Sequence, residues 1–301
     1  MAIKSFLPDE IVFRENETGD RFYQVLAGQV EVFIGYETDD ERQLTLLGPG
    51  TFFGEIAALG AYPRTATIVT SGSGATLLEL SADTLTESFN DNPMLILTLL
   101  QNIGRRIVSL SKDCDEAHQT LDALKDSTLK PAVPSLLDKA KTLAAYFFGP
   151  GKNADGTTLE KEIESGNYKH LRDGYSMQVF TCGKGSVLFR EEDPGACMYA
   201  VHFGRVGIYS GYGTDKERKI TDLYADSFFG EIGMLCGLPR SATAVVLEDD
   251  TTLEIIKPED IAELFKNNPP KVLMILEHLI RRLRSLTAEY ADVCKEICSL
   301  Q

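Results

Sequence analysis

The sequence repeats itself at a fixed spacing of 176 residues. The stretch FFGEIAALGAYPRTAT at residues 52–67 returns as FFGEIGMLCGLPRSAT at residues 228–243. The same offset aligns further pairs without a gap: Phe13 with Phe189, Gly19 with Gly195, Tyr23 with Tyr199, Pro93 with Pro269, and Arg106 with Arg282. A self-match at one offset indicates a duplicated domain. We therefore expect two domains that superpose without insertions, which the chain length of 301 residues allows.

The repeated stretch combines residue types that suit a small sugar phosphate. Gly54 lets the backbone turn sharply and approach a ligand closely. Glu55 offers only hydrogen-bond acceptors when ionised, which suits a ribose hydroxyl group. We expect a short helix after Glu55 that ends at Pro63, with free backbone N–H groups at its start. Arg64 then supplies a permanent charge that can bind phosphate oxygens through two N–H groups, and Thr65 adds a hydroxyl group.

This arrangement resembles the phosphate-binding cassette of the cyclic-nucleotide-binding domain, whose pattern is F-G-E-[ILM]-x-L followed by P-R-x-A-T. The family includes the bacterial catabolite activator and the regulatory domains of cAMP- and cGMP-dependent kinases. The resemblance assigns Glu55 and Glu231 to the ribose 2′-hydroxyl group, and Arg64 and Arg240 to the cyclic phosphate. It assigns backbone amides and nearby hydroxyl groups to the phosphate oxygens. The candidate ligand-binding residues are Phe53, Gly54, Glu55, Ile56, Ala57, Arg64 and Thr65 in the first copy, and Phe229, Gly230, Glu231, Ile232, Gly233, Arg240 and Ser241 in the second.

Two relic cassettes that fold but bind no nucleotide are the alternative to this interpretation. Relics usually lose the glutamate or the arginine, whereas this chain retains both in each copy. The nucleotide base is left open, because a hydroxyl group after the arginine occurs in family members that bind cAMP and in members that bind cGMP. The base-reading positions on the long helix of the catabolite activator correspond to Leu110-Ser111 and Leu286-Thr287. We expect cAMP or cGMP as the ligand, with cAMP as the default, and no cofactor.

Each repeat begins with short strand-like segments that are separated by Gly, Asp and Pro. Short strands with frequent turn signals indicate a β-sandwich or a jelly roll. The family resemblance implies an eight-stranded barrel. We predict a mainly β fold with two jelly-roll β-barrel domains, each followed by a long helix. In the first copy the predicted strands include residues 24–26, 30–34, 43–47, 66–69 and 76–80.

Apolar residues at alternating spacings of four and three follow each predicted barrel. We expect a helical stretch from about Ser81, an interruption at Pro93, and a long helix from about Met94. Such a pattern over about four heptads is typical of a coiled coil, and the alternative is a helix that lies against its own barrel. The apolar positions are Ile96, Leu100, Ile103, Ile107, Leu110, Cys114, Ala117, Leu121 and Leu124, then Val272, Leu276, Leu279, Leu283, Leu286, Tyr290, Val293 and Ile297.

The two long helices can pair within one chain or between two chains, and the sequence leaves both arrangements open. The first arrangement is an intrachain pseudo-dimer, and the second is a homodimer. We divide the chain into a first domain with its long helix at residues 1–127, a connector at 128–176, and a second domain with its helix at 177–301. The connector contains an amphipathic segment, Ser135–Phe148, that we expect to be helical.

Composition narrows the functional class. A net charge of −15 and a pI of about 4.8 argue against nucleic-acid binding, which requires a basic surface. No apolar run approaches the roughly 20 residues of a membrane span, and the N-terminus lacks the apolar core of a signal peptide. The six cysteines show neither a CxxC spacing nor a zinc pattern with histidine. We therefore expect a cytoplasmic protein with reduced cysteines and no membrane partner.

No kinase, cyclase or phosphodiesterase motif is present, so we expect no enzymatic activity. A metal-dependent cupin would need a histidine cluster, and only His202 falls in a predicted strand. No helix-turn-helix pattern follows the second long helix, and no kinase-inhibiting segment precedes the first domain, so we expect neither module. We predict a cyclic-nucleotide sensor of the bacterial regulator type, with one site per domain, whose helices rearrange and signal to an unknown protein partner. A structural or interaction protein with relic barrels is the alternative.

Overall fold

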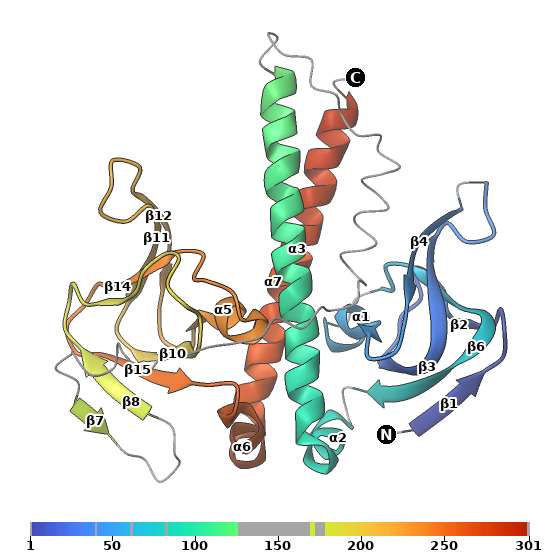
Figure 1. Cartoon of the computed structure of the whole chain (residues 1–301), viewed down its shortest axis with the longest axis horizontal. Helices are drawn as coiled ribbons and strands as arrows, with labels where there is room; N and C mark the ends of the chain where they lie inside the picture. The colour runs from blue at the N-terminus through green and yellow to red at the C-terminus, as the bar shows by residue number, and fades with distance from the viewer. Residues whose placement is uncertain are drawn as a thin grey trace. The chain divides into compact units, whose positions relative to one another are not determined.

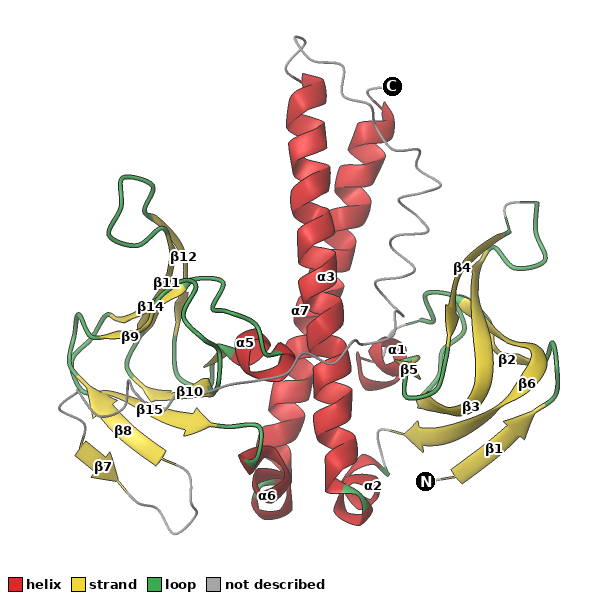
Figure 2. Ribbon diagram, viewed as in Figure 1, coloured by secondary structure: helices red, strands yellow, loops and turns green. Residues whose placement is uncertain are grey.

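The computed structural model describes residues 2–39, 41–60, 63–81, 84–125, 169–171 and 178–299. The chain forms two units, Met1–Lys152 together with Leu276–Gln301, and Asn153–Ile275. Each unit contains one copy of the repeated β-domain (Figure 1). Figure 2 shows that strands and loops dominate these domains and that helices follow them.

Two long, bent strands form the centre of the first β-domain. They are β3 (Arg21–Ile34) and β6 (Thr67–Ser81), and both pair along most of their length. Bulges between Val25 and Ala27 and between Gly28 and Val30 bend β3. Gly28 has a φ of 76°, and a Cβ atom there would lie 2.2 Å from the carbonyl oxygen of Gly74, so only glycine fits at this bend. The other strands are β1 (Ala2–Phe6), β2 (Ile11–Phe13), β4 (Arg42–Leu47) and β5 (Phe52–Phe53).

The second β-domain repeats this arrangement but divides the long strands. The equivalent of β3 becomes β10 (Met198–Phe203) and β11 (Val206–Ser210), and the equivalent of β6 becomes β14 (Thr243–Val246) and β15 (Thr251–Ile256). One sheet has the order β13-β10-β15-β8-β7 and the other β12-β11-β14-β9. Buried side chains from both sheets, among them Phe180, Tyr199 and Phe229, form one core. The remaining strands are β7 (Lys169–Leu171), β8 (Gln178–Cys182), β9 (Val187–Phe189), β12 (Arg218–Leu223) and β13 (Phe228–Phe229).

The fold class is the predicted one, because two mainly β, jelly-roll-like domains are each followed by a long helix. The sheets are not closed barrels, which corrects the eight-stranded barrel that the resemblance implied. In the described part of the first domain the sheet runs β1-β6-β3-β4, so β1 and β4 are its ends and do not pair. The bulges bend each long strand so that its two halves lie in different layers. The sheet therefore lacks the continuous stagger in hydrogen-bond register that a closed barrel requires.

The helices fall at equivalent positions in the two repeats. A short helix follows the aromatic pair in each cassette, as α1 (Glu55–Gly60) and α5 (Glu231–Cys236). The long helices are α3 (Pro93–Lys125) and α7 (Pro269–Ser299), preceded by α2 (Leu85–Asp91) and α6 (Asp260–Asn267). Both long helices begin at a proline, which suits the first helical position because its missing N–H has no helical partner there.

The long helices contact each other within the first unit, to which residues 276–301 of α7 belong. Sγ of Cys114 lies 3.5 Å from the carbonyl oxygen of Leu286. Farther along, Lys125 and Glu296 form an ion pair at 2.8 Å. Of the predicted heptad positions whose side chains are described, all are buried except Leu286, which is half-buried. The two long helices of this chain therefore contact each other, whereas the choice between an intrachain pseudo-dimer and a homodimer, like the coiled-coil supertwist, stays a prediction.

The predicted connector lies mostly outside the described residues, including the proposed helix at Ser135–Phe148. The exception is β7, a strand that the sequence analysis did not predict. It pairs antiparallel with β8, with Lys169 opposite Thr181 and Leu171 opposite Val179. Among the helices described, none combines the length and the apolar character that crossing a membrane requires.

Candidate functional site

The first cassette turns at Gly54, between β5 and α1. This residue has a φ of 79°, and a Cβ atom would lie 2.7 Å from Nη1 of Arg64, so the position excludes other residues. Glu55 is the first residue of α1, and its side chain is only 1% exposed. Phe53, just before the turn, packs its ring on Tyr23 at 5.4 Å and near Phe13 at 5.9 Å between ring centroids. These aromatic rings pack together next to the turn.

Arg64 is held in place by the backbone and by one aromatic ring. Its Nη1 donates to the carbonyl oxygen of Gly54 at 2.8 Å, and its Nη2 donates to the carbonyl oxygen of Arg21 at 2.6 Å. The guanidinium carbon lies 4.1 Å from the centre of the Phe13 ring, a cation–π distance. Burial lowers the pKa of Arg64, but a guanidinium remains charged at any ordinary pH. Its Nε has no hydrogen-bond partner among the described residues.

Glu55 connects the cassette to the long helix. Its Oε1 accepts a hydrogen bond from Nη1 of Arg106, a buried side chain on α3. Its second oxygen, Oε2, is buried and has no hydrogen-bond partner among the described residues. A buried carboxylate oxygen without a partner is costly, so this oxygen is an open position for a hydroxyl donor. The sequence analysis paired Arg106 with Arg282 in the repeat but gave it no ligand role.

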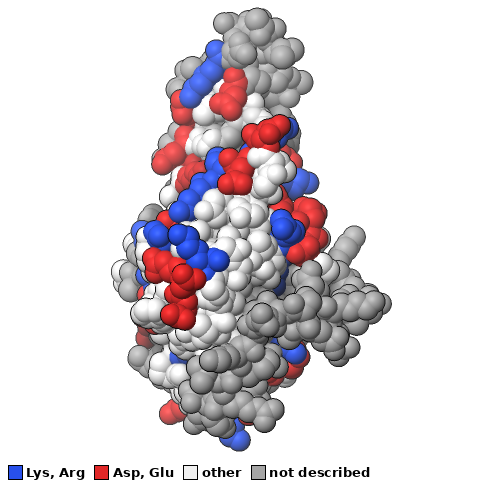
Figure 3. All heavy atoms as spheres, turned by 90° about the vertical axis from the view of Figure 1, so that its left-hand side faces the viewer, with Lys and Arg blue, Asp and Glu red and all other residues white. Residues whose placement is uncertain are grey.

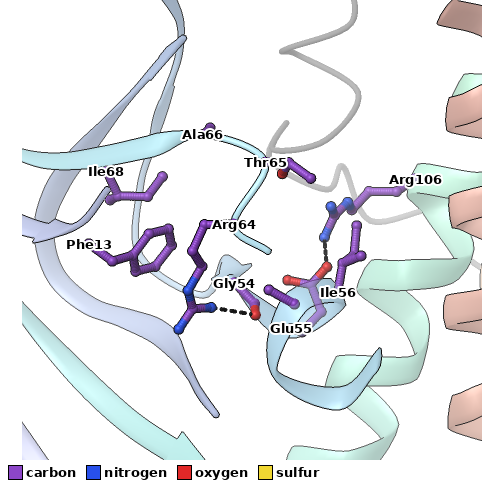
Figure 4. A pocket seen from close by; sticks show the side chains of 10 residues that line it. Phe13, Gly54, Glu55, Ile56, Arg64, Thr65, Ala66, Ile68 and Arg106 are labelled. Carbon is purple, nitrogen blue, oxygen red and sulfur yellow. Dashed lines mark hydrogen bonds and ion pairs between the residues drawn. The ribbon is translucent and has the colours of Figure 1, made fainter. Parts of the chain in front are cut away.

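A pocket of about 320 Å³, counted out to its open mouth, lies between these groups (Figure 4). Six of the seven residues predicted for the first site line it, and the seventh, Phe53, packs near Phe13 of the lining. In Figure 4, Arg64 and Phe13 lie on one side of the pocket, and the Glu55–Arg106 pair lies on the other side. The lining residues are Phe13, Gly54, Glu55, Ile56, Ala57, Arg64, Thr65, Ala66, Ile68 and Arg106.

The second cassette repeats the scaffold. Gly230 has a φ of 75°, and Arg240, 4% exposed, donates from Nη1 to its carbonyl oxygen at 2.8 Å. The guanidinium carbon lies 4.2 Å from the centre of the Phe189 ring, which replaces Phe13. The predicted residues Phe229, Glu231 and Gly233 are buried, Ile232 is half-buried and Ser241 is exposed. Both cassettes therefore present a buried guanidinium beside a buried acid at the first residue of a short helix.

Sequence reasoning identified the residues within each cassette and missed those that come from elsewhere in the chain. Phe13 and Arg106 reach the first pocket from β2 and α3. The signal that could have found them was the repeat itself, because both residues recur at the fixed offset, as Phe189 and Arg282. The described residues include no group of three or more His, Cys, Asp or Glu side chains placed to hold a metal ion.

Comparison with known proteins identifies the family of the two domains. The family model described as "Cyclic nucleotide-binding domain" matches residues 3–92 and 180–268, which together are more than half of the chain. The chain belongs to this family. Its cassettes, Phe52–Thr67 and Phe228–Thr243, lie inside the two matched regions. The resemblance that the sequence motifs suggested is thus confirmed.

Several curated proteins are similar to this chain over part of their length. It is 37% identical over 141 residues to the cGMP-dependent protein kinase egl-4 of Caenorhabditis briggsae, covering 46% of this chain and 18% of that protein. It is 24% identical over 246 residues to a cAMP-dependent protein kinase regulatory subunit of Mucor circinelloides f. lusitanicus, covering 81% and 44%. The chain thus spans less than half the length of these relatives. A solved structure of the regulatory domain of Toxoplasma gondii PKA with cAMP is 18% identical, with coverage of 92% of this chain and 84% of that one and a TM-score of 0.28.

Proposed function

We propose that this protein is a non-enzymatic cyclic-nucleotide sensor with one binding site in each domain. The observation that carries the proposal is the first pocket, where a buried arginine faces a buried glutamate with one open oxygen. Family membership makes a cyclic nucleotide the ligand class. The proposed ligand is cAMP or cGMP, and the exposed hydroxyl groups of Thr65 and Ser241 suit either one.

Arg64 is the proposed phosphate ligand. A guanidinium has five N–H groups, and two of those on Arg64 are used by the carbonyl oxygens of Gly54 and Arg21. Three N–H groups remain: the Nε–H, which has no partner among the described residues, and one hydrogen on each Nη. The edge that carries the Nε–H is the one proposed to bind phosphate oxygens. The carbonyl contacts and the Phe13 ring fix the orientation of this edge in advance, which lowers the entropic cost of binding.

Glu55 is the proposed ribose ligand and the proposed link to the helix. Its Oε2 is open to the 2′-hydroxyl group, while its Oε1 is already bound to Arg106 of α3. A nucleotide that engages Glu55 therefore acts on a side chain of the long helix through one shared carboxylate. Because α3 pairs with α7, a shift of α3 changes the surface of the helix pair, and we propose that a cytoplasmic protein partner recognises this change.

The surface offers a partner both signs of charge. On the face drawn in Figure 3, acidic and basic side chains are interspersed, and uncharged areas lie between them. The net charge of −15 is thus not concentrated into a single acidic field on that face. A partner that binds there has to match a mixed pattern, as protein partners do.

Alanine substitution of the two arginines tests the function. We expect Arg64→Ala and Arg240→Ala each to weaken binding at their own site by about 2–4 kcal/mol, because each removes a charge-assisted contact to phosphate. Titration calorimetry with cAMP and with cGMP measures both sites. The matched controls are Arg42→Ala and Arg218→Ala, which remove exposed arginines at equivalent positions of β4 and β12 and leave the cassettes intact.

Unchanged affinity in the Arg64→Ala/Arg240→Ala double variant would contradict the proposal. The alternative, a structural protein with relic pockets, predicts that no nucleotide stabilises the wild type. A ligand at about 100 times its dissociation constant adds roughly 2.7 kcal/mol to the folded state, which a thermal melt detects. Nucleotide retained through purification would hide this shift, so mass spectrometry of the supernatant from denatured protein belongs to the same experiment.

A further inference from the structure

The two pockets hold their arginines with different groups. In the first, Nη2 of Arg64 donates to the backbone carbonyl of Arg21 at 2.6 Å. In the second, Nη2 of Arg240 donates to Sγ of Cys197 at 3.6 Å. Cys197 follows Arg21 by the repeat spacing of 176 residues, so the same position of the repeat supplies a different acceptor. A thiol sulfur is a weak acceptor, and Arg240 is therefore held less firmly on this side.

Arg240 is otherwise prepared for an anion. Its side chain is 4% exposed, and its Nε is buried without a hydrogen-bond partner among the described residues. It also lies over the rings of Phe189 and Tyr199, at 4.2 and 5.9 Å from their centres. A buried cation with an uncommitted N–H group favours any acceptor oxygen placed beside it. An oxygen atom on the sulfur of Cys197 that accepts from this Nε–H would compete with a phosphate for the free edge of the guanidinium.

The residue that carries this sulfur is partly exposed. Cys197 is a free, half-buried thiol, whereas Cys114 and Cys182 are buried. Cys236 is also half-buried, and it lies on α5 of the same domain, which makes it the necessary control. In the first cassette the equivalent position is Arg21, which supports Arg64. Arg21 has no thiol that could be oxidised in the same way.

We propose that Cys197 is an oxidation site that controls the second pocket while the first pocket is unaffected. The proposal rests on the proposed function and concerns the regulation of one of its two sites. The thiol sulfur attacks one oxygen of hydrogen peroxide, so that an S–O bond forms and the O–O bond breaks. The released hydroxide takes the thiol proton and becomes water. The sulfur is oxidised by two electrons to a sulfenic acid, whose oxygen accepts from Nε of Arg240 in place of a phosphate.

Single-site variants make the effect measurable. Arg64→Ala leaves the second pocket as the functional one, and Arg240→Ala leaves the first. Each protein is treated with hydrogen peroxide, the excess is removed with catalase, and binding of cAMP and cGMP is measured by calorimetry. We expect the affinity of the Arg64→Ala protein to fall about tenfold or more, because a charge-assisted contact is lost, and to return after dithiothreitol. We expect no change in the Arg240→Ala protein.

Two cysteine variants assign the effect to one sulfur. In the Arg64→Ala background, Cys197→Ser should abolish the response to peroxide, and Cys236→Ser should keep it. Dimedone labelling with peptide mass spectrometry reports where sulfenic acid forms. The proposal is overturned by a label absent from Cys197, by a labelled Cys197 with unchanged affinity, or by a response that persists in Cys197→Ser. Absence of nucleotide binding before peroxide overturns the proposed function of the second pocket instead, so the two failures are distinguishable.

Discussion

Glu79 is a buried side chain that supports the first pocket indirectly, through its contact with Arg21. Its carboxylate, on β6, is 5% exposed, lies 2.5 Å from Nζ of Lys4, and accepts hydrogen bonds from Arg21 and from the hydroxyl group of Tyr23. Arg21 in turn presents the carbonyl oxygen that orients Arg64. Burial works to raise the pKa of Glu79, but hydrogen bonds and charges from Lys4 and Arg21 outweigh it, so the pKa lies below its usual value. Burial also raises the pKa of Tyr23 to about 12, and the charge of Glu79 adds to this effect.

The lowered pKa makes the stability of the first domain depend on acid. A carboxylate with a depressed folded-state pKa stabilises the fold above its unfolded-state pKa, and this contribution is lost as the pH falls through the folded-state value. We expect Glu79→Gln to lower the free energy of unfolding by about 1–3 kcal/mol at pH 7, because Lys4 and Arg21 lose their charged partner. The difference from wild type should shrink as the pH falls below the ordinary pKa of a glutamate, about 4, and then through the lower folded-state pKa at which wild-type Glu79 becomes protonated.

Urea denaturation at a series of pH values measures this effect. The control is Glu87→Gln, which removes an exposed carboxylate from α2 of the same domain and should change little at any pH. A difference between wild type and Glu79→Gln that stayed constant from pH 7 to pH 3 would show that the side chain acts through packing and not through its charge.

At the residue scale, the sequence predicted what lies within a cassette and not what folds onto it. Gly54, Glu55 and Arg64 are close in sequence, so their chemistry could be recognised as one motif. Arg106 is 51 residues from Glu55 on another element, and no local pattern relates the two side chains. Its place beside Ile107, in the apolar pattern of the long helix, favoured a structural role. Contacts between elements depend on packing, which a motif does not encode.

The first turns of the two long helices are attached to their domains by different chemistry. In the second unit, buried Glu254 of β15 accepts a hydrogen bond from Nζ of Lys271 on α7 and lies 2.5 Å from Nε2 of His202 on β10. Burial works to raise the pKa of Glu254, but His202 and Lys271 lower it below its usual value. In the first unit the three equivalent positions are Leu26, Leu78 and Leu95. The repeat thus has apolar residues at all three positions.

This comparison predicts a rescue experiment. Lys271→Leu alone should destabilise the second unit by about 3 kcal/mol, because it leaves a buried carboxylate with only the half-exposed His202 as a partner. The triple variant His202→Leu/Glu254→Leu/Lys271→Leu installs the residues of the first domain and should recover to within about 1 kcal/mol of wild type. Urea unfolding of the full chain measures both variants. A triple variant less stable than Lys271→Leu would mean that the junctions are not interchangeable.

At the element scale, the sequence predicted the strands, the cassette helices and the heptad helices, because each has its own periodicity or turn signals. It did not predict that the long strands stay continuous in the first domain and divide in the second. The division follows Gly204, whose φ of 87° turns the chain between β10 and β11. Gly28 occupies the same position and has a similar φ, yet there the strand remains paired through its bulges. The difference depends on tertiary pairing, which local sequence does not specify.

At the scale of the whole molecule, the chain contains both members of its helix pair. The contacts of Cys114, His118 and Lys125 reach Leu286, Glu289 and Glu296, each four or five positions earlier in the repeat. The His118–Glu289 and Lys125–Glu296 contacts have the diagonal spacing that e and g positions make between parallel helices whose heptads are in register. We propose that the duplication lets one chain supply both helices that two identical chains would otherwise have to assemble. The sequence could not decide between these arrangements, because a heptad pattern describes an interface and not the chain to which the partner belongs.

A designed disulfide distinguishes pairing within the chain from pairing between chains. Ala117 and Val293 occupy the same heptad position of α3 and α7, and both are buried. In parallel helices in register such positions face each other at a separation that a disulfide can span. We expect Ala117→Cys/Val293→Cys, in a background with Cys114→Ala and Cys294→Ala, to oxidise within one chain. Intact mass spectrometry should show the monomer with two hydrogens fewer.

The control is Ala117→Cys/Asp292→Cys, with the second thiol at an exposed position, which should oxidise poorly. A crosslinked product of twice the chain mass would mean that the helices exchange between molecules. The link from Glu55 through Arg106 to α3 would then act on the partner of a dimer.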